Sequence, residues 1–125
     1  MNTEIKGEAR ETVNENNTAL KMKSGGLMVY ATPAMIALAE QAAYKSVEPY
    51  LEEGQGTVGI LMNVKHLAAT PVGMEITAKS ELTSIEGRKL TFKIEVFDER
   101  EKIGEGVHER FIVNNEKFQN KANGK

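Results

Sequence analysis

The sequence has no cysteine among its 125 residues. This absence excludes disulfide bonds, thiolate metal sites and cysteine nucleophiles, and it is compatible with a reducing compartment. Long hydrophobic runs are missing too, because no stretch approaches the roughly 18 to 20 apolar residues that span a bilayer. The segment Met1–Arg10 is polar and has no apolar signal core. We therefore expect a cytoplasmic protein that is not inserted in a membrane.

An excess of positive charge is also absent, since the formal net charge is -2 at pH 7. This balance argues against a nucleic-acid partner, because proteins that bind nucleic acids usually carry a basic face. The apolar share of 40% and the charged share of 27% are ordinary for a globular protein. We predict one domain over residues 1–125, with a flexible tail at Gln119–Lys125, which lacks periodicity.

Several signatures of catalysis or cofactor binding are missing. There is no Walker loop, no GxGxxG and no GxSxG motif. The two histidines, His66 and His108, show no HxxxH or HExxH spacing, which argues against a zinc site. Asp98 is the single aspartate, so a catalytic pair of aspartates is excluded. We expect neither a metal nor another cofactor.

Alternating apolar and polar residues predict an antiparallel sheet in the second half of the chain. Turns at Glu86-Gly87 and at Asp98–Glu101 would join three strands: Glu75–Ser84, Leu90–Val96 and Ile103–Val113. In the third strand, the parity of Val107 and Phe111 predicts that these residues face the core, and that His108 and Arg110 face solvent or a partner. Thr57–Leu67 predicts a further strand in which Val58, Ile60, Met62, Val64 and His66 share a face, and Ile5–Leu20 gives a weaker strand signal.

A helix is predicted between these strands, from Thr32 to Glu48. Thr32 is a suitable N-cap, Pro33 suits the first helical position, and Pro49 cannot continue the helix. The run Ala34–Ala39 is apolar on every side, which predicts a helix buried on every side. In a chain this short, the expected cover is a strongly curved antiparallel sheet. This α+β arrangement of one long central helix in a curved sheet is the hotdog fold.

Three residues are candidates for chemistry. Glu40 interrupts the apolar helix and lies some 80° around it from Thr32, so the two can line adjoining parts of one groove; the alternative is that Glu40 forms the solvent-exposed edge of the helix. His66 ends a strand on its apolar face and titrates near neutral pH, as a general base should; the alternative is a structural histidine at the edge of the core. Thr32 has a structural explanation as a cap, and the positive helix end beside it can also hold an oxyanion.

Two blocks of sequence carry a resemblance. Val29–Glu40 (VYATPAMIALAE) and Lys65–Gly73 (KHLAATPVG) resemble the fluoroacetyl-CoA thioesterase family, a branch of the hotdog thioesterases. The resemblance extends from about Lys6 to Phe118. It implies a hydrolase that cleaves a small acyl-CoA thioester, with coenzyme A as part of the substrate.

The resemblance also implies roles for particular residues. Thr32, Glu40 and His66 would act together, Gly59 would allow the backbone to approach the acyl carbonyl, and Arg110 would help to shape the substrate site. His66 would be a general base or a nucleophile, and Glu40 would either orient a water or His66 or form a transient anhydride. Members of the family are homodimers with active sites at or near the subunit boundary, and we expect the same here.

Other functions remain open. Hotdog enzymes that depend on an aspartate do not fit, because Asp98 lies in a predicted turn. A non-catalytic protein that binds an acyl-CoA or another small ligand in the same groove is the main alternative. A purely structural dimer is a third reading.

Overall fold

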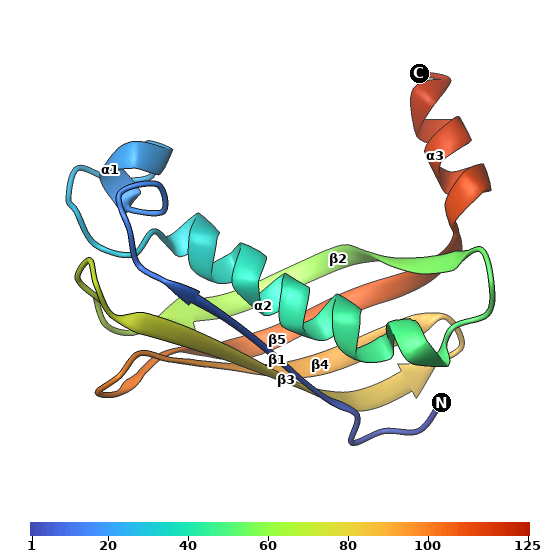
Figure 1. Cartoon of the computed structure of the whole chain (residues 1–125). Coiled ribbons are helices and arrows are strands. Elements are labelled where there is room, and N and C mark those ends of the chain that lie inside the picture. The colour runs from blue at the N-terminus through green and yellow to red at the C-terminus, as the bar shows by residue number, and fades with distance from the viewer.

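The computed structural model describes all residues, 1–125. A single antiparallel sheet of five strands has the order β1-β3-β4-β5-β2 (Figure 1). The elements follow one another as β1 (Lys6–Thr12), α1 (Ala19–Met22), α2 (Thr32–Val47), a short 3-10 turn (Glu48–Tyr50), β2 (Gln55–His66), β3 (Glu75–Glu86), β4 (Lys89–Phe97), β5 (Lys102–Asn114) and α3 (Asn115–Asn123).

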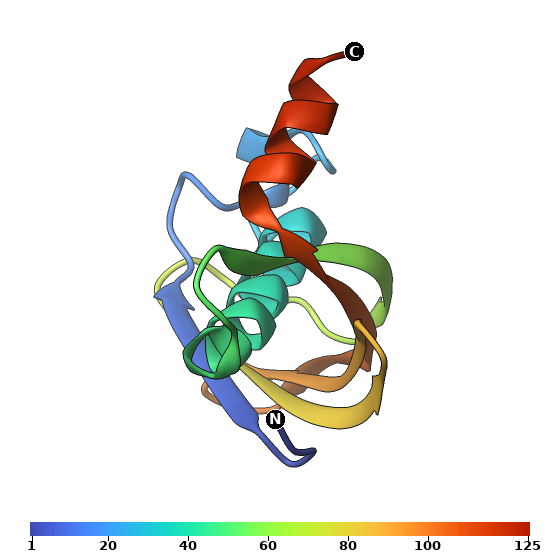
Figure 2. The same cartoon turned by 90° about the vertical axis from the view of Figure 1, so that its right-hand side faces the viewer.

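The sheet curves around α2, which lies lengthwise on its concave face (Figure 2). Viewed along the helix, β1 flanks one side of α2 and β2 the other, while β3, β4 and β5 pass beneath it. This arrangement confirms the predicted hotdog fold. The predicted hairpins are confirmed as well, since β3 and β4 turn at Gly87, whose φ of 63° suits glycine, and β4 and β5 turn between Phe97 and Lys102.

The core lies between α2 and the inward faces of β3 and β4. Met35 and Leu38 of the helix are buried there. Buried residues of the two strands alternate with exposed or half-buried ones, as predicted: Ile76, Ala78, Ser80 and Leu82 in β3, and Leu90, Phe92, Ile94 and Val96 in β4. Burial of these side chains is the main source of stability.

One face of α2 does not enter the core. Pro33, Ala37 and Lys45 are exposed, and Glu40 and Tyr44 are half-buried. The expectation of a helix buried on every side is therefore wrong for the single chain. The apolar run Ala34–Ala39 does not show burial on every side, because alanine is tolerated on either face of a helix.

The start of α2 also differs from the prediction. Ala31 is the N-cap and Thr32 is the first helical residue, with no side-chain hydrogen bond capping the helix. Instead of bonding a backbone N–H of the first turn, the Thr32 hydroxyl contacts another element. The end of the helix at Val47, just before Pro49, agrees with the prediction to within one residue.

In β2 and β5, the structure corrects the prediction of which residues face inward. The pairing of β2 with β5 shifts between Gly59 and Leu61, so Ile60 occupies a β-bulge and is 50% exposed. A bulge reverses which residues face inward. Met62, Val64 and His66 are partly buried as predicted, whereas the predicted inward position of Ile60 is wrong.

In β5 the predicted faces are reversed beyond Ile103, which is buried as predicted. Val107 and Phe111 are exposed, whereas His108 and Arg110 are buried. The prediction that His108 and Arg110 face solvent is therefore wrong. The prediction assumed that the apolar residues of this strand face inward. The inner face of the strand carries polar residues instead.

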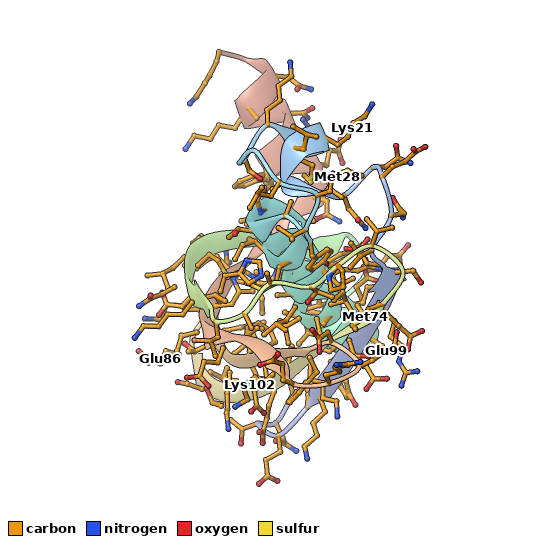
Figure 3. The ribbon with its side chains drawn as sticks, turned by 90° about the vertical axis from the view of Figure 1, so that its left-hand side faces the viewer. Lys21, Met28, Met74, Glu86, Glu99 and Lys102 are labelled. Atoms are coloured by element: carbon orange, nitrogen blue, oxygen red, sulfur yellow. The ribbon has the colours of Figure 1, made fainter.

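The ends of the chain complete the fold. The weak strand signal over Ile5–Leu20 corresponds to β1 and the short α1. Lys21 of α1 and Met28 of the following loop stand over the start of α2, whereas Met74 and Glu99 lie toward the sheet (Figure 3). At the other end, residues 115–123 form α3, which projects from the sheet and buries no residue, so part of the tail is helical. Its flexibility stays a prediction.

A close approach between β1 and α2 gives a test of this packing. A Cβ atom added at Gly7 would lie 2.2 Å from the carbonyl oxygen of Ala42 and 2.7 Å from Oγ of Ser80. Because the obstacle is backbone, we expect Gly7→Ala to lower the free energy of unfolding by about 1–3 kcal/mol. Urea denaturation at a fixed protein concentration measures this. Gly26→Ala is the control, since a Cβ there meets nothing within 4 Å, and equal stability of the two variants would contradict the packing described.

Candidate active site

The first cluster of polar residues lies where α2 begins and β2 ends. Oγ1 of Thr32 and Nδ1 of His66 are 2.8 Å apart and share a hydrogen bond. Thr32 is brought there by the start of the helix and His66 by the end of its strand. The two residues line a hollow of about 370 Å³ together with Ala19, Ser24, Val29, Tyr30, Leu67, Ala68 and Ala69.

The His66 ring is poised to accept a proton. Burial disfavours the charged imidazole and holds the pKa of His66 below its ordinary value, although the nearby carbonyl of Ala68 opposes this shift. Its Nε2 atom is buried and has no hydrogen-bond partner in the chain. A neutral ring with one unpaired nitrogen can act as a general base.

The beginning of α2 adds a positive electrostatic potential to this cluster. The first N–H groups of a helix have no partner within it, and the helix dipole places a partial positive charge there. A developing oxyanion beside Thr32 would be stabilised by both.

A second cluster lies further along α2, around Glu40. Oε2 of Glu40 and Nη1 of Arg110 are 3.5 Å apart. A Cβ atom at Gly59 would lie 2.7 Å from the same carboxylate oxygen. Any side chain at this position would displace the carboxylate, so glycine lets β2 pass close beneath Glu40. The Glu40 side chain remains 41% exposed, whereas that of Arg110 is 8% exposed, so Glu40 is the member of the pair that can reach a ligand.

Arg110 is held by several contacts. Nε donates to Oγ1 of Thr57 at 2.8 Å, and Nη2 donates to the Thr57 carbonyl at 2.9 Å. The guanidinium also lies 5.6 Å from the ring centre of Tyr44. Burial lowers the pKa of Arg110 and the Glu40 carboxylate opposes this shift. Sequence analysis placed Arg110 near the substrate only through resemblance, and the structure brings it to Glu40.

His108 joins this cluster and was not among the predicted site residues. Its Nε2 lies 3.1 Å from Nη1 of Arg110. The signal that could have revealed it is the spacing of Gly104, Gly106, His108 and Arg110, which share the inward parity of β5.

The two clusters are separate within one chain. Thr32 and Glu40 are eight residues apart on α2, which is about 12 Å along a helix axis. The Thr32 hydroxyl bonds the His66 ring, and the Glu40 carboxylate accepts from Arg110. Glu40, Gly59 and His108 line a hollow of about 240 Å³ that does not include Thr32 or His66. The structure therefore brings together Thr32 with His66, and Glu40 with Gly59 and Arg110, but does not unite the predicted triad.

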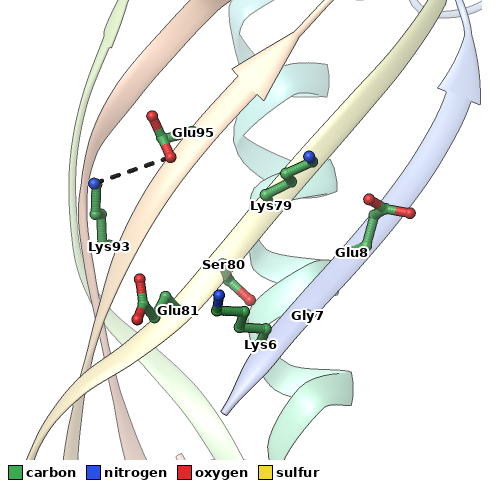
Figure 4. A pocket seen from close by; sticks show the side chains of 8 residues that line it. All are labelled: Lys6, Gly7, Glu8, Lys79, Ser80, Glu81, Lys93 and Glu95. Atoms are coloured by element: carbon green, nitrogen blue, oxygen red, sulfur yellow. Dashed lines mark ion pairs between the residues drawn. The ribbon is translucent and has the colours of Figure 1, made fainter. Parts of the chain in front are cut away.

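Another hollow, of about 430 Å³, lies on the outer face of the sheet (Figure 4). Figure 4 shows charged side chains of both signs across it, including the Lys93–Glu95 ion pair at 4.0 Å. No hydrophobic residue lines it, and its charges alternate between neighbouring strands: Lys6, Glu8, Lys79, Glu81, Lys93 and Glu95. Such a surface suits solvent better than an apolar ligand.

Two further features of the whole chain bear on function. No three His, Asp or Glu side chains gather closely enough to hold a metal ion. None of the helices has the length and apolar character that crossing a membrane would require.

Comparison with known proteins adds to this geometry. The family described as fluoroacetyl-CoA-specific thioesterase matches residues 13–116. The fluoroacetyl-CoA thioesterase of Streptantibioticus cattleyicolor is 42% identical over 97 residues, which cover 78% of this chain and 70% of that protein.

Solved structures agree with this likeness. The fluoroacetyl-CoA thioesterase FlK superposes with a TM-score of 0.94 at 34% identity, over 100% of this chain and 97% of the other. A variant of FlK in complex with acetyl-CoA has the same TM-score at 32% identity, over 99% and 98% of the two chains. A hot-dog-like protein from Thermanaerovibrio acidaminovorans, at 19% identity, has a TM-score of 0.86 over 96% and 89% of the chains and supports the fold alone.

The His66 environment predicts a pH dependence. Because burial lowers its pKa in the folded chain, we expect His66 to titrate below its ordinary value of about 6.5. The unfolded chain then binds more protons, so this residue's contribution favours unfolding as pH falls below about 6.5 and disappears at higher pH. NMR titration of the two imidazoles, assigned with His66→Asn, measures this. Titration of His66 at or above the value found in denatured protein would contradict the burial described.

Proposed function

Because this chain belongs to the fluoroacetyl-CoA-specific thioesterase family, we propose that it hydrolyses the thioester of a small acyl-CoA through Thr32, Glu40 and His66, without a metal. The products are a carboxylate and free coenzyme A. The contact between Thr32 and His66 at the positive end of α2 is the observation that carries this proposal.

In the proposed reaction, His66 is the general base. The hydrogen bond between Nδ1 and Thr32 orients the ring, and Nε2, which has no partner in the chain, accepts a proton from the attacking water. The water oxygen bonds to the thioester carbon, and the carbonyl electrons move onto its oxygen. When the tetrahedral intermediate collapses, the C–S bond breaks and the proton on Nε2 passes to the leaving coenzyme A thiolate. The carboxylic acid that forms loses its own proton to solvent.

Thr32 stabilises the negative charge that develops on the carbonyl oxygen. If its hydroxyl accepts the Nδ1–H of His66, its own proton is free to donate to the oxyanion. The first N–H groups of α2 supply further donors. One such donor is worth about 10²- to 10³-fold in rate.

Glu40 orients the attacking water in this proposal. It is partly exposed and is paired at 3.5 Å with Arg110. The reaction needs no metal, because a thioester carbonyl is already a good electrophile. A cytoplasmic location, expected from the sequence, belongs to the same proposal.

We further propose that Glu40 meets the Thr32–His66 pair of a second subunit in a homodimer. The two clusters are about 12 Å apart along α2 in one chain, so a shared site requires another copy. β2 offers a seam, because it forms one edge of the sheet and exposes Ile60 and Leu61, which are 50% and 44% accessible. An unpaired strand edge is suited to pairing with a second chain.

Single-site variants test the catalytic assignment. We expect His66→Ala and Glu40→Gln each to lower kcat by about 10²- to 10⁴-fold, since each removes a group that moves or orients a proton. A steady-state assay of coenzyme A release across a panel from acetyl- to aryl-CoA measures this and identifies the acyl group.

Gln41→Ala is the control on the same helix, because Gln41 is half-buried and lies outside both clusters; it should retain wild-type kcat. Wild-type turnover in His66→Ala and Glu40→Gln would overturn the assignment. Tight binding of acyl-CoA without turnover by the wild-type chain would show the alternative, a non-catalytic binding protein.

Mixed dimers test the shared site. In a dimer of one Glu40→Gln subunit and one His66→Ala subunit, a shared arrangement places both defects in one site and leaves the other site intact. We therefore expect co-refolding of the two inactive variants to restore about half of the wild-type kcat per mixed dimer. Absence of any recovery in mixed dimers isolated by two affinity tags would show that each site lies within one chain.

A further inference from the structure

His108 is almost completely buried although its side chain is polar. It lies in β5 at 1% exposure, opposite Phe92 of β4 and Met62 of β2. Its ring stacks on Phe92 with centroids 6.1 Å apart and planes inclined by 29°. Neither the sequence motifs nor the proposed reaction uses this residue.

The hydrogen bonds of His108 fix its protonation. Nδ1 lies 2.8 Å from the carbonyl oxygen of Leu61, which can only accept, so Nδ1 carries the hydrogen. Nε2 lies 3.1 Å from Nη1 of Arg110, which can only donate, so Nε2 carries a lone pair. The ring is therefore neutral and held in a single tautomer. Burial and the Arg110 charge lower the pKa of His108, against the Leu61 bond and the Glu40 carboxylate, in keeping with a neutral ring.

The bulge in β2 is part of this arrangement. The register between β2 and β5 shifts at Ile60, and the Leu61 carbonyl next to the bulge accepts from the His108 ring. On the other side of the bulge, Gly59 passes directly below Glu40. A Cβ atom at Gly59 would lie 3.3 Å from Cε1 of His108. One backbone irregularity thus serves both the histidine and the carboxylate.

Arg110 is the link between His108 and Glu40. Thr57 receives its Nε–H and an Nη2–H. The remaining nitrogen, Nη1, faces Nε2 of His108 at 3.1 Å and Oε2 of Glu40 at 3.5 Å. With Thr57 on one edge and His108 on the other, the planar guanidinium cannot rotate away from the carboxylate.

We propose that His108 is a positioning residue, a neutral imidazole that acts through Arg110 to fix the orientation of the Glu40 carboxylate. This inference rests on the proposed function, since it assigns Glu40 a part in the reaction. A purely structural histidine would fill space against Phe92 and would not need Arg110.

The variants His108→Phe and His108→Gln separate these roles. Phenylalanine keeps the ring and its stacking but offers Arg110 no acceptor, whereas glutamine can present an amide oxygen near the position of Nε2. We expect His108→Phe to lower kcat about tenfold to a hundredfold with little change in KM, as loss of a hydrogen bond to a charged group implies. His108→Gln should recover part of that loss. Glu105→Gln, exposed on the same strand, is the control.

A double-mutant cycle shows whether the effect passes through Arg110. In an Arg110→Met background, His108→Phe should cause no further loss of kcat. Additive losses, or wild-type kcat in His108→Phe, would overturn the inference. An inactive wild-type chain contradicts the proposed function instead, so the two failures are distinguishable.

A measurement on the wild-type protein covers the case in which His108→Phe does not fold. At pH 7 the nitrogen chemical shifts of the ring should show hydrogen on Nδ1 only, and the ring should titrate below the ordinary histidine value of about 6.5. A His108 ring with hydrogen on Nε2, or one that titrates at or above that ordinary value, would overturn the inference whether or not the chain is active.

Discussion

The close contact of α2 with the concave face of the sheet is the constraint on which the rest of the structure depends. Gly7 of β1 leaves no room for a side chain against Ala42, and Ala39 and Ala43 are completely buried. Small residues let two backbones approach closely, and close-packed interiors deform little. The helix is thereby fixed in rotation and in height, so Thr32 meets the end of β2 and Glu40 lies over Gly59. The packing of α2 on the sheet thus positions both Thr32 and Glu40, although these two residues do not contact each other.

The two clusters along α2 differ in how they are held. Thr32 and His66 form a pair joined by one hydrogen bond beside an open hollow. Glu40 instead sits on a base of side chains in which Arg110 is bonded to Thr57 and His108. A pair held by one contact suits the proton transfer proposed for His66, and a group held by several contacts suits the orienting role proposed for Glu40.

Sequence patterns predicted the parts of the fold in which apolar residues face the core and polar residues face solvent. β3 and β4 alternate regularly because one face is buried and the other is wet, and Pro49 marks the end of α2. The patterns failed in β5, where His108 and Arg110 face inward and Phe111 outward, because the interior beside the candidate site is polar. The bulge at Ile60 was also beyond prediction, since it depends on the pairing of two strands far apart in sequence. The contact of Thr32 with His66 agrees with their joint prediction. The prediction that Thr32 and Glu40 line adjoining parts of one groove is wrong within one chain, since they line different hollows.

The strand order has a consequence for how the chain assembles during synthesis. β1 pairs with β3, and β2 pairs with β5, so both edge strands are made before their partners. The apolar face of α2 therefore leaves the ribosome with little sheet to cover it, and pairings this distant in sequence form slowly. The β3–β4–β5 meander, made last, supplies both the cover for α2 and the partner for β2. The contacts around Arg110 can therefore form only after residue 110 has been synthesised. A nascent chain released earlier would expose the apolar face of α2, which favours aggregation.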